Sequence, residues 1–401
     1  MKKFRYLDWW ILAPYLVLIA IGVVMVYSAS SGILLANNLP ANAYFKKQLG
    51  FALIGVFLVF FTYLLRVELF YYRKMVLLIL GISLVFMIFL LILKIVRPSA
   101  AVNGAVGWIN IFGITVQPVE ISKFALIIYL AFIFGRKETD LHYHAYFKTI
   151  TAPVLLAMFF MLLAALQPDM GGAGILLLIT MVMVAASGIP WIFSVGIFAV
   201  LGSFLTFGIY FLGHLDTNSP ILRTLKISGY QLARIQDLFH PFQVAQHGGQ
   251  QLVNSYYAIN NGGWFGRGLG RSIQKMGYLP EPYTDFILSI TAEELGIIGV
   301  AIIIILLGIL IIRSIYIGIR VRRNTYLALI CYGIGTMMFI QVLFNIGGVL
   351  GVLPITGVTL PFISYGGSSM LILSVCMGLL MNISAYDKRQ QAHTQEIKKE
   401  G

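Results

Sequence analysis

Charged residues and cysteines are both scarce in this 401-residue sequence. Only 11% of the residues are charged, against about 25% in an ordinary soluble domain, whereas 59% are hydrophobic. The two cysteines, Cys331 and Cys376, lie inside apolar runs, which excludes a disulfide framework and favours two buried small side chains over a redox pair. The net charge of +13 comes from basic residues in short segments between apolar runs, so no nucleic acid partner is expected. The composition is that of a protein embedded in lipid.

Long apolar runs account for most of the chain. A helix that crosses a bilayer needs about 20 mostly apolar residues, because lipid offers no partner for unpaired backbone groups. Ten runs of this kind are present, of which the fifth and sixth are short: 9–29, 49–65, 75–95, 119–135, 150–166, 171–188, 191–212, 286–312, 326–350 and 361–384. The sequence therefore predicts an all-α, polytopic membrane protein with about ten transmembrane helices.

The distribution of lysine and arginine predicts the orientation. If the N-terminus is cytoplasmic, the inner segments hold 17 lysines and arginines, whereas the short outer segments carry only Lys46, Lys47, Lys94 and Arg97. The long segment 213–284 is a poor reporter of topology because of its length. Both termini are therefore expected in the cytoplasm, and 213–284 becomes one long extracellular loop.

The chain reads as one transmembrane domain, residues 1–386, followed by a polar, lysine-rich tail, 387–401, that is expected to be cytoplasmic and disordered. The first apolar run follows three basic residues, as in a signal peptide, but its length and the Trp9-Trp10 pair favour a retained span. Within the long loop, Leu252, Tyr256 and Ile259 recur at helical spacing, which predicts a short helix at the membrane interface. The following glycines, 262–270, are expected to form a mobile turn.

Few acidic residues lie at membrane depth, and each is a functional candidate because burying a charge is costly. Glu120 and Lys123 are three residues apart on the fourth span, so they either form an ion pair or line a polar cavity in which Lys123 attracts an anionic substrate. Asp169 follows Gln167-Pro168, where a turn or a cap of the sixth helix is favoured.

Asp285 lies where the long loop turns into the eighth span. Thr284 or Asp285 has the position of an ordinary helix N-cap. These residues alone slightly favour this interpretation over a catalytic role. The alternative is a general base, because partial desolvation of a carboxylate on a rigid helix end raises its pKa toward the useful range. Glu293 lies about 80° around the helix from Asp285 and can share its cavity, whereas Glu294 lies on the opposite side.

Basic residues of the long loop are candidates for binding a pyrophosphate or a lipid headgroup. Arg234 and Lys275 are the two selected for substrate binding, although scattered cations in a loop also serve simply as solvated charges. The histidines of the loop have no metal-binding spacing, and the sequence shows no dedicated metal site.

Several short motifs follow one another in an order typical of one family. They are Met25-Val26-Tyr27-Ser28-Ala29-Ser30, Asn103-Gly104-Ala105, Trp108-Ile109, Gln117-Pro118-Val119-Glu120 with Lys123, Gln167-Pro168-Asp169, Leu279-Pro280-Glu281 with Thr284-Asp285-Phe286, Glu293-Glu294-Leu295-Gly296 and Leu360-Pro361-Phe362-Ile363-Ser364-Tyr365-Gly366-Gly367. With them the chain resembles the SEDS family (shape, elongation, division and sporulation), the FtsW and RodA proteins, over nearly its whole length. It looks closer to the division-type FtsW branch.

The resemblance implies a peptidoglycan glycosyltransferase that polymerises lipid II at the outer face of the bacterial cytoplasmic membrane, at the division septum. It also implies a partner transpeptidase of the class B penicillin-binding type and other divisome membrane proteins. The family's catalytic aspartate matches Asp285, and its cavity-lining glutamate and lysine match Glu120 and Lys123. One departure is Gly107, which stands where the family often has a basic residue before the Trp-Ile pair, so this chain lacks any substrate contact made by that residue.

Residues and resemblance together give a mechanistic hypothesis. Asp285 accepts the proton of the acceptor sugar hydroxyl, and Lys123, Arg234 or a divalent cation (Mg²⁺ or Mn²⁺) offsets the charge of the departing pyrophosphate. The rival hypotheses are a lipid II flippase, which the intramembrane charges suit, an elongation-type RodA-like polymerase, and a scaffold without activity.

Overall fold

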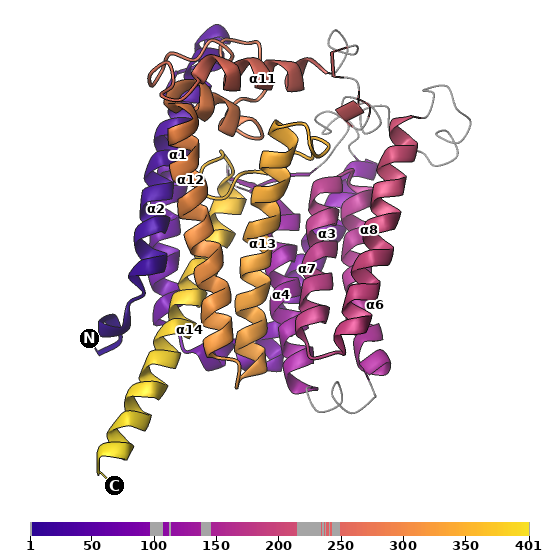
Figure 1. The fold of residues 1–401 in the computed structure, drawn as a ribbon, viewed down its shortest axis with the longest axis vertical. Coiled ribbons are helices and arrows are strands. Elements are labelled where there is room, and N and C mark those ends of the chain that lie inside the picture. The colour runs from indigo at the N-terminus through magenta and orange to yellow at the C-terminus, as the bar shows by residue number, and fades with distance from the viewer. Residues whose placement is uncertain are drawn as a thin grey trace.

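The computed structural model shows an upright bundle of apolar helices beneath a loop layer (Figure 1). The structure describes the following residues: 2–96, 107–111, 114–137, 146–214, 234, 236, 238–239, 241–242 and 249–400. The motif Asn103-Gly104-Ala105 lies outside the described residues.

Each of the ten predicted apolar runs forms a helix. The ten are α1 (Trp9–Ala36), α2 (Ala43–Leu64), α3 (Arg73–Val96), α4 (Pro118–Arg136), α6 (Tyr146–Leu166), α7 (Met170–Ala186), α8 (Trp191–Gly213), α12 (Ile287–Arg320), α13 (Thr325–Val349) and α14 (Gly367–Glu400). Within the described part of the chain, nine helices are long and apolar enough to cross a membrane, and α7 is the shorter tenth. The predicted all-α membrane fold is therefore confirmed.

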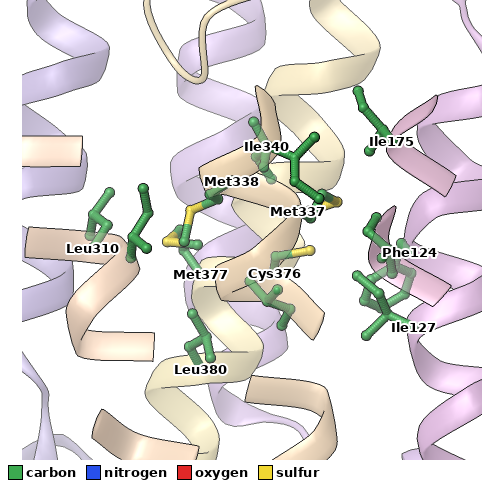
Figure 2. Packing of buried hydrophobic residues seen from close by; sticks show 14 of the residues in the cluster. Phe124, Ile127, Ile175, Leu310, Met337, Met338, Ile340, Cys376, Met377 and Leu380 are labelled. Atoms are coloured by element: carbon green, nitrogen blue, oxygen red, sulfur yellow. The ribbon is translucent and has the colours of Figure 1, made fainter. Parts of the chain in front are cut away.

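The core lies where α4, α13 and α14 meet, because these helices bury most of their apolar windows whereas α8 buries none of its own. Figure 2 shows this packing, with Met337 and Met338 from α13 beside Cys376 and Met377 from α14. Methionine and cysteine suit such a place because their polarisable sulfurs fill irregular gaps. Both cysteines are free and buried, as predicted.

A small hairpin was not predicted from the sequence. Strands β1 (Ile109–Ile111) and β2 (Ile114–Val116) pair antiparallel, with Ile109 opposite Val116. The Ser368 hydroxyl at the start of α14 donates to the Thr115 carbonyl at 3.0 Å. The hairpin is thereby attached to the bundle directly before α4.

The long loop contains the predicted short helix, α11 (Gln250–Gly262), which lies across the top of the bundle in Figure 1. The segment 263–270 forms turns, in which Gly266 lies against the backbone of α12 whereas Gly268 and Gly270 are exposed, and the expected mobility of this segment stays a prediction. A Cβ on Gly262 would lie 1.9 Å from the Ala292 carbonyl oxygen, and one on Gly296 would lie 2.3 Å from the Trp264 carbonyl oxygen. Gly296 has a φ of 72° within α12, a left-handed conformation that glycine adopts without steric cost. These glycines permit close contact between loop and helix.

Both termini lie at the end of the bundle opposite α11 (Figure 1). The expectation of a disordered tail is wrong, since α14 continues to Glu400. Its polar end is held by an ion pair of 2.9 Å between Arg320 and Asp387 and by a hydrogen bond from Lys388 to the Leu7 carbonyl. The first helix, α1, packs inside the core against α12.

Candidate functional site

Asp285 lies at the outer end of the bundle, where the long loop enters α12. It is half-buried and lines a pocket of about 10 Å³, which holds roughly one water molecule. The other lining residues come from α12, α13 and the segment after α13: Phe286, Phe344, Asn345, Gly348, Val349, Ile355, Thr356, Gly357 and Val358. The N-cap position of α12 is Phe286, without a side-chain cap, so the capping interpretation of Thr284 or Asp285 does not hold. The Asp285 carboxylate remains available for another role.

The backbone around Asp285 is fixed by side chains from other elements. The Asn345 amide donates to the carbonyls of both Asp285 and Val358 at 2.9 Å, and the Ser364 hydroxyl donates to the Thr284 carbonyl at 2.7 Å. Sequence reasoning did not select Asn345. Its signal was a side-chain amide, one of two with Gln341, in a largely apolar span, where a buried polar group needs partners.

The electrostatic environment of Asp285 favours proton transfer near neutral pH. Burial raises the pKa of the Asp285 carboxyl to about 6, Arg234 opposes this rise, and Glu281 and Asp169 add to it. The Arg234 guanidinium donates to the Ile355 carbonyl at 2.9 Å. A pKa near 6 leaves the carboxylate ionised at neutral pH but still basic enough to accept a proton.

Gly357 makes room for the two charged groups. A Cβ at this position would lie 3.5 Å from Asp285 Oδ2 and 3.7 Å from Arg234 Nη1, so both side chains approach the same point of the backbone. The φ of Gly357 is 74°. Arg234 therefore lies near Asp285, although the two are far apart in sequence, and its predicted role in substrate binding stays a prediction.

Glu120 and Lys123 form a buried ion pair on α4, with 2.7 Å between Lys123 Nζ and Glu120 Oε1. Asp169 is the side-chain cap of α7, as predicted, and accepts hydrogen bonds from the Gly172 amide at 2.6 Å and the Gln117 side chain at 3.2 Å. Burial raises the pKa of Asp169, Lys123 lowers it and Glu120 raises it. Since Asp169 also raises the pKa of Asp285, the α4 pair and Asp285 belong to one electrostatic group.

Lys275 and Glu293 lie elsewhere, between the loop and α12, and neither lines the Asp285 pocket. Lys275 Nζ lies 2.6 Å from Glu294 Oε1 and 3.0 Å from the Ser28 hydroxyl. Glu293 accepts hydrogen bonds from the Ser272 hydroxyl and from loop backbone and side-chain nitrogens. Both charged side chains therefore hold the loop against α12. Substrate binding by these two residues stays a prediction.

Two further sequence observations concern metal and Gly107. No group of three His, Cys, Asp or Glu side chains with the arrangement of a metal site occurs in the described residues. No atom of the described residues lies within 4 Å of the point where a Cβ on Gly107 would stand.

The sequence of this chain matches a known protein family over almost its whole length. Residues 8–389 match the family of cell cycle proteins comprising FtsW, RodA and SpoVE. The chain is 38% identical over 407 residues to the "Probable peptidoglycan glycosyltransferase FtsW" of Lactococcus lactis subsp. lactis strain IL1403, covering 98% of this chain and 95% of that protein.

Solved structures show the same fold. The chain matches a structure described as "Structural coordination of polymerization and crosslinking by a peptidoglycan synthase complex", with a TM-score of 0.71, 25% identity, and coverage of 95% of this chain and 98% of that one. It also matches the rod shape determining protein RodA of Thermus thermophilus, with a TM-score of 0.64, 25% identity, and coverage of 94% and 96%.

Proposed function

Because the chain belongs to the FtsW/RodA/SpoVE family of cell cycle proteins, we propose that it is a peptidoglycan glycosyltransferase that polymerises lipid II into glycan strands. The greater identity to an FtsW protein than to a RodA protein supports the division-type role, in septal wall synthesis. The observation that carries the catalytic part is the Asp285 pocket, where a carboxyl with a pKa of about 6 lies beside a guanidinium.

In the proposed reaction, an acceptor sugar hydroxyl attacks the anomeric carbon of a lipid II donor. The new glycosidic C–O bond forms as the bond to the pyrophosphate oxygen breaks, and the hydroxyl proton passes to Asp285. The polyprenyl pyrophosphate leaves with the bonding electron pair. In this proposal Arg234, whose guanidinium lies near Asp285 at Gly357, offsets the charge that develops, since preorganised positive groups lower the barrier to such a departure.

The α4 pair has a supporting role in this proposal. Lys123 is buried, and its charge acts on Asp169, which in turn acts on Asp285. A divalent cation can also accompany the pyrophosphate, because Mg²⁺ commonly binds substrate phosphates with only one or two protein carboxylates. Such a cation supplies additional positive charge at the leaving group.

The proposal includes a partner and a location. The resemblance to a peptidoglycan synthase complex that couples polymerisation to crosslinking supports a class B penicillin-binding transpeptidase as the partner. The protein is a multi-pass membrane protein, and the septum of the cytoplasmic membrane, with other divisome proteins, is its proposed site of action.

The test is polymerisation of lipid II by the purified protein with its transpeptidase partner, with and without divalent cation. Glycan chains are expected from the native complex. Absence of polymer under every condition would refute the activity.

The buried charge pair of α4 is also what a flippase would need, so a second assay is required. Translocation of the lipid II headgroup into liposomes is measured for the native protein and for Asp285→Asn. The glycosyltransferase proposal predicts no translocation above protein-free liposomes. Translocation that persists in the variant would support the flippase.

A further inference from the structure

A second pocket lies at the opposite end of the bundle from Asp285. Its volume is about 390 Å³, within the range of small-molecule sites. The residues that line it come from the N-terminus, the end of α2, the short helix η2 (Val67–Tyr71) and the polar part of α14: Lys3, Leu64, Leu65, Arg66, Val67, Glu68, Asn382, Tyr386 and Arg389. The glycosyltransferase mechanism uses none of these residues.

The floor of this pocket is an ordered hydrogen-bond network. Lys3 Nζ donates to the Leu65 carbonyl at 2.9 Å and to Asn382 Oδ1 at 2.8 Å. The Asn382 amide donates to the carbonyls of Thr62 and Leu65 at 3.0 and 2.9 Å. Three separate parts of the chain are thus joined at the open C-terminal end of α2.

The pocket carries an excess of positive charge. Lys3, Arg66 and Arg389 face a single acid, Glu68, and none of the ion pairs in the described part of the chain includes any of these four. Burial lowers the pKa of Lys3, Arg389 lowers it further and Glu68 raises it. A bound anion would offset this repulsion, which favours an anionic ligand.

The position of the pocket matches the level of lipid headgroups. The apolar helix α2 ends at Leu64, whose side chain is 52% exposed, and the cationic residues follow directly after it. This is the end that carries both termini (Figure 1), and the distribution of basic residues predicts that it faces the cytoplasm. Basic pockets between helices at this face suit anionic headgroups, and a neighbouring exposed leucine suits an acyl chain.

We propose that the pocket formed by Lys3, Arg66, Asn382, Tyr386 and Arg389 binds the phosphate headgroup of an anionic phospholipid in the cytoplasmic leaflet. Arg66 and Arg389 are exposed and bind the phosphate, because a guanidinium donates two parallel hydrogen bonds to phosphate oxygens. Lys3 and Asn382 form the rigid floor beneath it. The bound lipid fastens the end of α2 to α14.

The test uses the full-length protein in nanodiscs and in detergent. Native mass spectrometry counts the lipids retained from phosphatidylglycerol or phosphatidylcholine, and thermal unfolding is followed during titration with each lipid or with inorganic phosphate. The variant is Arg66→Gln/Arg389→Gln. The matched control is Arg322→Gln/Arg323→Gln, which removes the same charge from two exposed residues at the same end but outside the pocket.

The native and control proteins are expected to retain phosphatidylglycerol, and this lipid should raise their unfolding temperature. The affinity of the pocket variant for phosphatidylglycerol should be about tenfold weaker. Two single variants, Arg66→Gln and Arg389→Gln, each with an intermediate loss, guard against misfolding of the double variant. Equal retention by native and pocket variants, or an equal loss in the control, would overturn the proposal. Inorganic phosphate that stabilises as much as the lipid would show a site for free phosphate instead.

Discussion

Asp285 owes its chemical character to its surroundings. Its carboxyl is half-buried, held through its backbone by Asn345 and approached by Arg234 at Gly357. Burial raises the pKa and Arg234 restrains the rise, so the group titrates at about 6. A base has to be deprotonated to act, and activity should therefore fall as the pH falls through this value.

The first prediction concerns Arg234→Gln. Removing the guanidinium removes the influence that lowers the pKa of Asp285, so the acidic limb of the polymerisation rate should move from about pH 6 to higher pH. The pH dependence of the rate is measured at saturating lipid II. The control is Arg267→Gln, an exposed loop arginine that is not among the charges acting on Asp285. An acidic limb that does not move in Arg234→Gln would contradict the electrostatic link.

The site could be predicted from the sequence only where single residues carried the signal. Asp285, Glu120 and Lys123 stood out as charges at membrane depth. Asn345 did not, because its importance depends on donating hydrogen bonds to the carbonyls of two segments that come from elsewhere in the chain. Lys275 looked like a free loop cation, but folding buries it against Glu294.

At the scale of elements, α13 connects the core to the Asp285 pocket. Asn345 lies one turn from its end and donates to carbonyls on both sides of the pocket. The second prediction is that Asn345→Ala loses about 1–3 kcal/mol of stability, because two carbonyls lose their donor, and polymerises lipid II at least tenfold more slowly. Thermal unfolding and polymerisation rates are compared with those of Leu343→Ala, which truncates a side chain that is 45% exposed on the same helix. Equal rates in the two variants would show that Asn345 has no special role.

The long loop is joined to α12 by a buried ion pair. Lys275 and Glu294 are 2% and 0% exposed, so removing either one leaves an uncompensated charge in the protein interior. The third prediction is that Lys275→Met and Glu294→Gln each cost about 3–5 kcal/mol, whereas the double variant recovers much of the loss.

Thermal unfolding of the four proteins in this double-mutant cycle gives the coupling energy. Arg320 and Asp387 form a more exposed pair on the opposite end, and its cycle should give only about 1 kcal/mol or less. Losses that simply add for Lys275 and Glu294 would rule out the direct pairing.

At the scale of the whole molecule, the sequence predicted the helices well because lipid imposes a length and a composition on each span. It missed the hairpin at Ile109–Ile111 and Ile114–Val116, since strands of three residues leave no periodic pattern. It also predicted disorder from Asp387 onward, where α14 continues as a helix and Arg320 contacts Asp387 and Gln391. The local amino-acid composition of a segment carries no information about its contacts with distant parts of the chain.

The orientation of the molecule is the fourth prediction. Cys331 and Cys376 are 0% exposed and should not react, so single cysteines can be added at surface positions. Phe265→Cys, in the outer loop and 83% exposed in the native protein, should react in intact cells with a maleimide that does not cross the membrane. His393→Cys, an exposed position near the C-terminus, should react only after the cells are opened. The reverse pattern would invert the assigned topology.

The fifth prediction tests the catalytic role of Asp285 most directly. Lipid II binding and polymer formation are measured side by side for the native complex, for Asp285→Asn, and for Glu281→Gln, which neutralises an exposed acid four residues away. Asp285→Asn should bind lipid II but form polymer at least a hundredfold more slowly, since a positioned general base contributes about 10²–10⁴ to a rate. Glu281→Gln should remain active. Polymer formation by Asp285→Asn at the native rate would contradict the account.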